Sequence, residues 1–270
     1  MKSLGNFPDP FMAEIAGQPD ALRRAAARGV EQADRVARLT ELAPGRTLIF
    51  TGMGSSYDAC YPAVAELAHA GVPAIMVDSA ELLHFRGGLL GPATLLIAVS
   101  QSGESAEVVR VAGAARGRSD PPAIVAVTNG GTNPLAALAD VVFDTAAGPE
   151  TGPSTMTFAG SLVAVGTIGR VLASHRRDAA LEHLEAETEL AAVAIERILE
   201  DAGLPDSLAT WLEGRTTVVI LGRGPARAAA EMGALTIKEA VAMPIESLQT
   251  AQFRHGPLEM VGPSLAAIVI

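Results

Sequence analysis

The chain is 270 residues long, which suits two compact domains better than one. It carries a net charge of −10, and among its 20 basic residues only Lys2 and Lys238 are lysines. Binding to a nucleic-acid backbone requires a basic face, so the composition argues against a nucleic-acid partner. Hydrophobic residues make up 49% of the chain and aromatic residues only 4%, which favours a core of aliphatic side chains, as between helices and a parallel sheet.

Cys60 is the single cysteine, which excludes an intramolecular disulfide and a cysteine-based metal cluster and favours a cytoplasmic location. Its apolar neighbours predict a buried, unreactive thiol. The N-terminus lacks the basic and apolar regions of a signal peptide. Residues 158–173 form the most apolar segment, but polar and glycine residues interrupt it and it is too short to span a bilayer. We therefore predict a buried helix there and no membrane partner.

The first half of the chain predicts a helical segment followed by alternating strands and helices. Residues 11–43 read as helix, with an early break at Gln18-Pro19. Short apolar runs bounded by Gly, Pro, Ser or Asp predict strands at residues 47–51, 74–77, 94–99, 123–127 and 141–144. Helical patterns between them indicate βαβ crossovers. The expected fold is α/β, a flavodoxin-like three-layer sandwich whose parallel sheet is covered on both faces.

A second unit follows a charged amphipathic helix predicted at residues 179–202. The sequence of residues 47–54, TLIFTGMG, is echoed by TVVILGRG at residues 217–224, which indicates a duplicated α/β unit. The second copy offers strands at 218–221, near Ile245 and at 265–270, and a helix at 226–240. Because it ends after its third strand, we expect an incomplete copy and a natural chain that continues past Ile270. The predicted organisation is a helical segment (1–43), a first domain (44–178), a linker helix (179–204) and a partial second domain (205–270).

The turn after the third predicted strand carries three hydroxyl groups. It reads Ser100-Gln101-Ser102-Gly103-Glu104-Ser105 and precedes a helix-like stretch. A helix N-terminus has unpaired N–H groups and a partial positive charge, and serine hydroxyls add hydrogen-bond donors there. We predict an anion pocket; the alternative is a polar loop in which Ser105 caps the helix.

Two further turns belong to the same edge of the predicted sheet. The first strand is followed by Gly52-Met53-Gly54-Ser55-Ser56, whose glycines allow a close approach of the backbone to a ligand. Tyr57 occupies the third glycine position of a dinucleotide fingerprint, which disfavours a dinucleotide site. The last strand of the unit is followed by Thr151-Gly152-Pro153-Ser154-Thr155, whose alternative interpretation is a helix cap. Hydroxyl-rich turns on one edge favour a site for a phosphate and a polyol.

Together these strings resemble the SIS (sugar isomerase) domain family, in particular the isomerase half of glutamine-fructose-6-phosphate amidotransferase, which has two SIS domains, and SIS-type glucosamine-6-phosphate deaminases. The matching strings run from residues 14–19 to residues 255–258. The resemblance implies substrate or phosphate contacts for Ser55, Ser56, Ser100, Gln101, Ser102 and Ser105. It also implies that Ser154 touches the sugar and that Glu239 moves a proton between C1 and C2. His255 matches a histidine that opens the sugar ring from the neighbouring subunit, so the resemblance implies a homodimer with a shared active site.

The chain also departs from the amidotransferase pattern. Thr236 and Met156 stand where that family has lysines, and its C-terminal tail lysine and its glutaminase domain are absent from this sequence. We therefore expect no glutaminase activity. The first hypothesis is a phosphosugar isomerase or glucosamine-6-phosphate deaminase without metal or other cofactor, acting on a sugar phosphate. The alternatives are a non-catalytic phosphosugar sensor and a fructosamine-6-phosphate deglycase.

Overall fold

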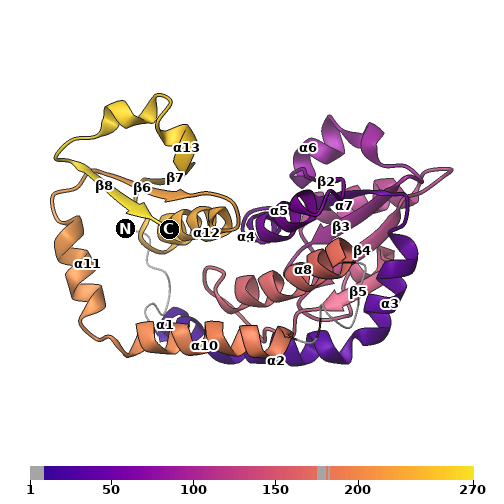
Figure 1. The fold of residues 1–270 in the computed structure, drawn as a ribbon, viewed down its shortest axis with the longest axis horizontal. Helices are drawn as coiled ribbons and strands as arrows, with labels where there is room; N and C mark the ends of the chain where they lie inside the picture. The colour runs from indigo at the N-terminus through magenta and orange to yellow at the C-terminus, as the bar shows by residue number, and fades with distance from the viewer. Residues whose placement is uncertain (1–8, 175–180, 182) are drawn as a thin grey trace.

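The computed structural model describes residues 9–174, 181 and 183–270 (Figure 1). Its strands are β1 (Thr47–Thr51), β2 (Ala74–Met76), β3 (Thr94–Val99), β4 (Ala123–Thr128), β5 (Val141–Asp144), β6 (Thr217–Gly222), β7 (Ile245–Gln249) and β8 (Leu265–Val269). Its α-helices are α1 (Asp9–Ala16), α2 (Gln18–Glu31), α3 (Ala33–Leu42), α4 (Ser55–Asp58), α5 (Tyr61–His69), α6 (Ser79–His84), α7 (Ala106–Arg116), α8 (Met156–Ser174), α10 (Leu184–Glu200), α11 (Leu204–Leu212), α12 (Ala226–Val241) and α13 (Thr250–Phe253). Short 3-10 turns are η1 (Gly87–Leu89), η2 (Ala136–Leu138) and η3 (Pro257–Met260).

The first sheet has five parallel strands in the order β2-β1-β3-β4-β5, which is the flavodoxin-like order. Leu48 of β1 lies opposite Ala74 of β2 on one side and Leu95 of β3 on the other. All residues of β3 and β4 are buried, because helices cover both faces of the sheet. The α/β sandwich predicted from the sequence is confirmed for this unit.

Successive residues of the central strands feed two separate cores, as the alternation of side chains along a strand requires. Phe50 and Ile97 pack with Val165 of α8 on one face. Ile49 and Leu96 pack with residues of α7 on the other. The sheet therefore forms the middle layer of three, with α5 and α8 on one side and α6 and α7 on the other (Figure 1).

The N-terminal segment is divided more often than the sequence predicted. The expected helix over residues 11–43 breaks at Gly17, just before Pro19, and again at Gln32. The side chain of Gln32 explains the second break, because it is buried and bonds to the backbone of Asp144 at the end of β5 in both directions, donating at 3.1 Å and accepting at 2.8 Å. Backbone groups 112 residues away in the sequence thus contribute to ending α2.

The apolar segment predicted as a buried helix is α8. It is long and apolar enough to cross a membrane, but 67% of its most apolar window is buried inside the protein. It packs against α2 and α5. At Gly169 a β-carbon would lie 2.8 Å from Cβ of Ala63, so this glycine allows α8 and α5 to approach closely. The burial confirms the predicted core helix.

Among the described residues, the connection to the second unit contains the two helices α10 and α11 where the sequence predicted one. α10 ends at Glu200 and α11 follows after Gly203, while residues 179, 180 and 182 of the predicted linker helix lie outside the described residues. α10 lies along α2, where Arg23 pairs with Glu189 and Glu196 at 2.7 Å each. The sequence missed α11, a nine-residue helix with Pro205 in its first turn.

The second sheet has three parallel strands in the order β7-β6-β8, the arrangement that β2-β1-β3 have in the first. Ala230 and Ala234 of α12 pack against Val218 and Ile220 of β6. α12 also contacts α4 and α5, which joins the two units. The sequence predicted these strands and α12; that this unit is a partial second copy of the same domain stays a prediction.

Candidate functional site

The order of the first sheet places a crevice at the carboxyl ends of β1 and β3. Chain connections leave β1 toward β2 on one side and continue from β3 toward β4 on the other. In open α/β sheets ligands bind at such a switch point. The turns at residues 52–56 and 100–105 follow these two neighbouring strands, as the sequence predicted.

The turn after β1 closes tightly against β3. A β-carbon on Gly52 would lie 3.0 Å from the carbonyl oxygen of Val99, so only a glycine fits there. Gly54 has a φ of +52° and is followed by α4, which begins at Ser55. Ser56 is buried, whereas Ser55 reaches the surface of the crevice.

The serine-rich turn after β3 is held by its own hydroxyls. The buried Ser100 Oγ accepts a hydrogen bond from Gly103 N at 3.2 Å and lies 3.0 Å from Ser105 Oγ. Ser102 is exposed, and its Oγ accepts from Glu104 N at 3.1 Å. Ser105 is the residue before α7, but its side chain makes no capping hydrogen bond.

The loop after β5 is anchored by two carboxylates. Glu14 of α1, which is buried, accepts from Thr151 N at 2.6 Å, from Thr151 Oγ1 at 2.9 Å and from Gly152 N at 3.0 Å. Glu150 accepts from Thr155 N and Thr155 Oγ1 at 2.7 and 2.8 Å. These bonds hold Ser154 at the start of α8, facing the crevice.

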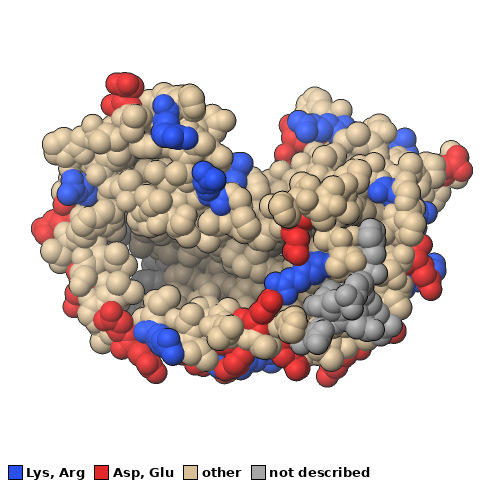
Figure 2. Space-filling model, viewed as in Figure 1, with Lys and Arg blue, Asp and Glu red and all other residues tan. Residues whose placement is uncertain are grey.

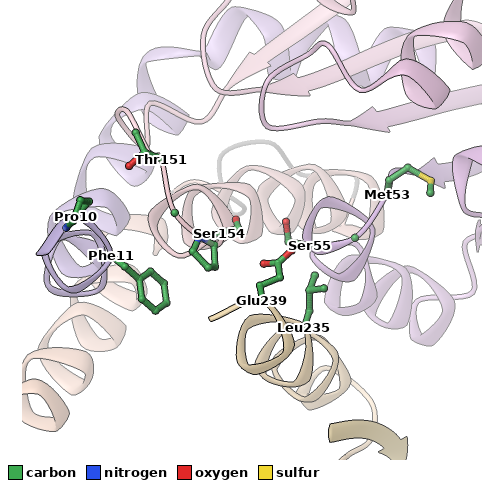
Figure 3. Close-up of a pocket in the computed structure, with 11 residues that line it drawn as sticks. Pro10, Phe11, Met53, Ser55, Thr151, Ser154, Leu235 and Glu239 are labelled. Atoms are coloured by element: carbon green, nitrogen blue, oxygen red, sulfur yellow. The ribbon is translucent and has the colours of Figure 1, made fainter. Parts of the chain in front are cut away.

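A cleft of about 810 Å³ joins these elements to the second unit (Figure 3). Its lining residues come from α1, the turn after β1, the loop after β5 and α12, and are Pro10, Phe11, Met53, Gly54, Ser55, Thr151, Gly152, Pro153, Ser154, Leu235 and Glu239. Figure 3 shows the side chains of Ser55, Ser154 and Glu239 gathered in the middle of the view. Three of the residues singled out from the sequence therefore meet in one cleft.

Glu239 is the charged group of that cleft. It lies on α12 beside Leu235, and burial raises the pKa of its carboxyl group above the usual range, although part of the side chain faces solvent. The neighbouring Lys238 turns away and pairs with Glu246 of β7 at 3.2 Å. The two residues are consecutive on α12, so their side chains point to different sides of the helix.

The remaining predicted residues do not line this cleft. Ser56 is buried beneath the turn after β1, and Ser100, Gln101, Ser102 and Ser105 lie on the neighbouring turn. His255 is exposed, two residues after α13. Within the described residues no group of three or more histidine, cysteine or acidic side chains could hold a metal ion.

A second polar cluster, which was not predicted from the sequence, lies where α4 and α5 meet α12. The Arg227 guanidinium stands 4.6 Å from the centre of the Tyr61 ring and 3.0 Å from Glu231. Ser247 donates to the other oxygen of Glu231. Burial, together with the charge of Glu231, raises the pKa of Asp58 to about 7 despite the opposing effect of Arg227.

Residues 41–171 match the SIS domain family. The chain therefore contains a SIS domain over these residues. A glutamine-fructose-6-phosphate aminotransferase (isomerizing) of Pyrobaculum aerophilum is 33% identical over 279 residues, covering 100% of this chain and 44% of that protein. One from Pyrococcus horikoshii is 28% identical over 272 residues, covering 100% of this chain and 45% of that protein. The chain thus spans less than half the length of these curated relatives.

Solved structures share the fold over almost the whole chain. The C-terminal domain of glucosamine-fructose-6-phosphate aminotransferase from Francisella tularensis superposes with a TM-score of 0.84 at 21% identity, covering 100% of this chain and 77% of that one. Tagatose-6-phosphate ketose/aldose isomerase from Escherichia coli does so with a TM-score of 0.69 at 20% identity, covering 95% and 71%.

The matched SIS domain contains the serine-rich turns and Ser154, whereas α12 and residue 255 lie outside it. Glu239 therefore reaches the SIS domain's crevice from a different part of the chain. Sequence reasoning missed the residues that complete the cleft wall, Phe11 and Leu235, and the anchors Glu14 and Glu150. In the sequence, Glu14 and Glu150 stood out only as parts of the longer strings that resemble the SIS family.

Proposed function

We propose that this SIS-domain protein is a phosphosugar isomerase or deaminase that binds an amino-sugar or ketose 6-phosphate, such as glucosamine 6-phosphate or fructose 6-phosphate. The observation that carries the proposal is the meeting of Glu239 with Ser55 and Ser154 in one cleft at the switch point of the sheet. A carboxylate beside hydroxyls suits acid-base chemistry on a polyol. The names of the relatives and of the solved neighbours support the same substrate class.

In this proposal Glu239 is the catalytic base. Its carboxylate takes the proton from C2 of the open-chain sugar and returns it to C1, while a proton passes from the C2 hydroxyl to the C1 carbonyl oxygen, so that an aldose and a ketose interconvert through an enediol. With an amino group at C2, protonation of the corresponding enolamine at C1 leaves an imine at C2, and water hydrolyses this imine to the ketose and ammonia. The raised pKa that burial gives Glu239 favours this role, because a stronger base removes a carbon-bound proton more readily.

The phosphate belongs at the carboxyl ends of β1 and β3. Ser56, Ser100, Gln101, Ser102 and Ser105 surround the N-termini of α4 and α7, and the partial positive charge of the 11-residue α7 favours an anion. Ser55 lies between this end and Glu239. A sugar phosphate would then extend from the serine-rich turn toward α12.

We further propose a homodimer of tandem SIS domains with a shared active site. The division is a helical segment (1–43), a first domain (44–178), a linker (179–204) and a partial second domain (205–270). The exposed position of His255 supports a role in the cleft of a second copy, where it would open the sugar ring. Light scattering should give twice the mass of the chain with the sugar phosphate present. A monomer at micromolar concentration contradicts the shared site.

Deuterium exchange tests the catalytic step directly. When the protein is incubated with fructose 6-phosphate or glucosamine 6-phosphate in deuterated water, deuterium should replace hydrogen at the carbon next to the carbonyl. NMR measures the rate of this exchange. Glu239→Gln should lower the exchange rate about 10²- to 10⁴-fold and leave the dissociation constant nearly unchanged. Glu246→Gln is the matched control, because that exposed carboxylate pairs with Lys238 outside the cleft. Equal exchange in wild type and Glu239→Gln would remove Glu239 from the mechanism.

Ligand stabilisation tests the phosphate site. Phosphorylated sugars should raise the melting temperature, and the free sugars should not. Ser102→Ala should weaken binding by about 1 to 3 kcal/mol, because it removes a hydrogen bond to a charged group. Ser207→Ala on α11 is the control, since that hydroxyl donates to the backbone oxygen of Gly203 at 2.9 Å, outside the cleft. Equal stabilisation by glucose and glucose 6-phosphate contradicts the proposal.

A non-catalytic phosphosugar sensor is the second candidate. Thr236, where a lysine is expected, faces a cavity beside α1 and α8 and supplies no cation there. Tight binding of sugar phosphate without any exchange in a dimeric protein would favour the sensor. Release of an amino acid from a fructosamine 6-phosphate would instead favour a deglycase.

A further inference from the structure

Four hydrogen-bond donors converge on the carboxyl group of Glu150. Thr155 N and Thr155 Oγ1 donate to one oxygen at 2.7 and 2.8 Å, and Thr157 N approaches the same oxygen at 3.4 Å. Thr157 Oγ1 donates to the other oxygen. A carboxylate accepts hydrogen bonds only, so the hydroxyl proton of Thr157 is committed to Glu150.

The hydrogen bond from Thr157 to Glu150 determines the direction of the hydrogen bond between Thr157 and Ser154. Ser154 Oγ lies 2.8 Å from Thr157 Oγ1. A threonine hydroxyl has one proton, and since Thr157 gives its proton to Glu150, Ser154 must be the donor in this contact. Thr157 is buried, which removes water as an alternative partner for its lone pair. The proton of Ser154 therefore points at Thr157, and its lone pairs are left for the cleft.

The other hydroxyl of the loop is arranged in the same way. Thr151 also lines the cleft, and its Oγ1 donates to Glu14 at 2.9 Å. The adjacent Gly152 N–H is taken up by the same carboxylate at 3.0 Å. The hydroxyls of Thr151 and Ser154 thus make the loop after β5 an acceptor wall of the cleft, and the carboxylate of Glu239 on α12 adds two more accepting oxygens.

We propose that Glu150, acting through Thr157, is a positioning residue that fixes Ser154 as a hydrogen-bond acceptor, so that this wall selects a ligand group that donates, a hydroxyl or an ammonium. The inference rests on the proposed sugar-phosphate site and deepens it. It orients the ligand, because phosphate oxygens are acceptors and are turned away from an acceptor wall. The phosphate is left for the serine-rich turns, and the hydroxyl or amino end faces α12.

The simpler role of Glu150 is to cap α8, which begins at Met156, through the N–H groups of Thr155 and Thr157. Two matched variants separate the roles. Thr155→Val and Thr157→Val each remove one hydroxyl that donates to Glu150, and both residues are buried. Of these two hydroxyls, that of Thr157 is the one hydrogen-bonded to Ser154 Oγ. A capping role predicts the same effect of both variants on ligand selectivity, whereas the proposal predicts a change in Thr157→Val alone.

Calorimetry with analogues of glucose 6-phosphate measures the selectivity. At C2, C3 and C4 in turn, the hydroxyl is replaced by an amino group, which donates, or by fluorine, which does not. At the carbon that faces Ser154, the fluoro analogue should bind about 10-fold more weakly than the amino analogue in wild type, the size expected for one lost hydrogen bond. This ratio should fall several-fold in Thr157→Val, persist in Thr155→Val and return in Thr157→Ser. A ratio that is equal in both valine variants overturns the proposal.

Neutron diffraction of crystals exchanged into deuterated water decides the bond direction without any ligand. The deuteron of Ser154 should point at Thr157 Oγ1 in wild type and in Thr155→Val, and should turn away in Thr157→Val. A deuteron directed into the cleft in wild type overturns the proposal, whichever sugars bind. If no phosphorylated sugar binds any variant, the proposed function fails, and with it the selectivity inferred here, whereas the neutron result still decides the Ser154 bond.

Discussion

Asp58 should make the protein less stable as the pH rises. It ends α4 and is half-buried against α12, where Glu231 repels its charge and Arg227 is engaged with Glu231 at 3.0 Å. Burial, the largest cause, and Glu231 together raise its pKa from 3.8 to about 7. Replacement by asparagine keeps nearly the same shape and removes the ionisation.

The sign and size of the effect follow from the pKa. Between pH 4 and pH 7 the folded protein holds a proton on Asp58 that the unfolded chain has released, so the free energy of unfolding falls as the pH rises through this window. A shift of this size corresponds to about 4 kcal/mol at full strength. Because part of the side chain is screened by water, we expect about 2 kcal/mol above pH 7.

Urea unfolding at pH 4, 6 and 8 measures this difference. Asp58→Asn should match wild type at pH 4 and exceed its free energy of unfolding by about 2 kcal/mol at pH 8. Asp120→Asn, which removes an exposed loop carboxylate, is the control variant. Carbon-13 NMR of the Asp58 carboxyl gives its pKa directly. An ordinary value near 4, or a stability difference that does not vary with pH, would refute the reasoning.

Three further predictions concern stability and reactivity. Glu14→Ala should lower the free energy of unfolding by about 2 kcal/mol, because three donors of the loop after β5 lose a charged acceptor; no loss in urea unfolding contradicts this anchor. Gly169→Ala should lower the free energy of unfolding by about 1 to 3 kcal/mol, since the added carbon would lie 2.8 Å from Cβ of Ala63. Gly166→Ala, which has open space around it, should instead raise the free energy of unfolding by up to about 1 kcal/mol. If thermal unfolding ranks the two variants the other way, the close contact between α8 and α5 is refuted. Cys60 is fully buried and burial raises its pKa, so Ellman's reagent should label it at the rate of unfolding, and fast labelling of the folded protein would contradict this burial.

The strands were predictable because each is a short apolar run closed by turn residues. The expected ranges 94–99 and 141–144 coincide with β3 and β5. The break at Gln32 was not predictable, since it depends on hydrogen bonds to Asp144, 112 residues away. A helical pattern records which face is apolar and carries no information about a side chain that turns inward to bind another strand.

The candidate site divides in the same way. The turns at residues 52–56 and 100–105 could be placed at one edge because carboxyl ends of parallel strands share it. The sequence could not show that Ser154 donates to Thr157, because the direction of that bond depends on where Glu150 lies. The second polar cluster, which contains Asp58, Arg227 and Glu231, likewise forms because α12 packs against α4 and α5. The sequence does not show this packing.

The cleft takes Ser55 and Ser154 from the first sheet unit and Glu239 from the second. Any molecule that contacts all three residues is therefore part of the interface between the units, and its binding free energy adds to the stability of both units together. Because a bound molecule contacts both units, neither unit can unfold without breaking contacts to that molecule. Occupancy of the cleft should thus draw the melting of the two units together into a single event, and loss of the occupant should let them come apart in succession.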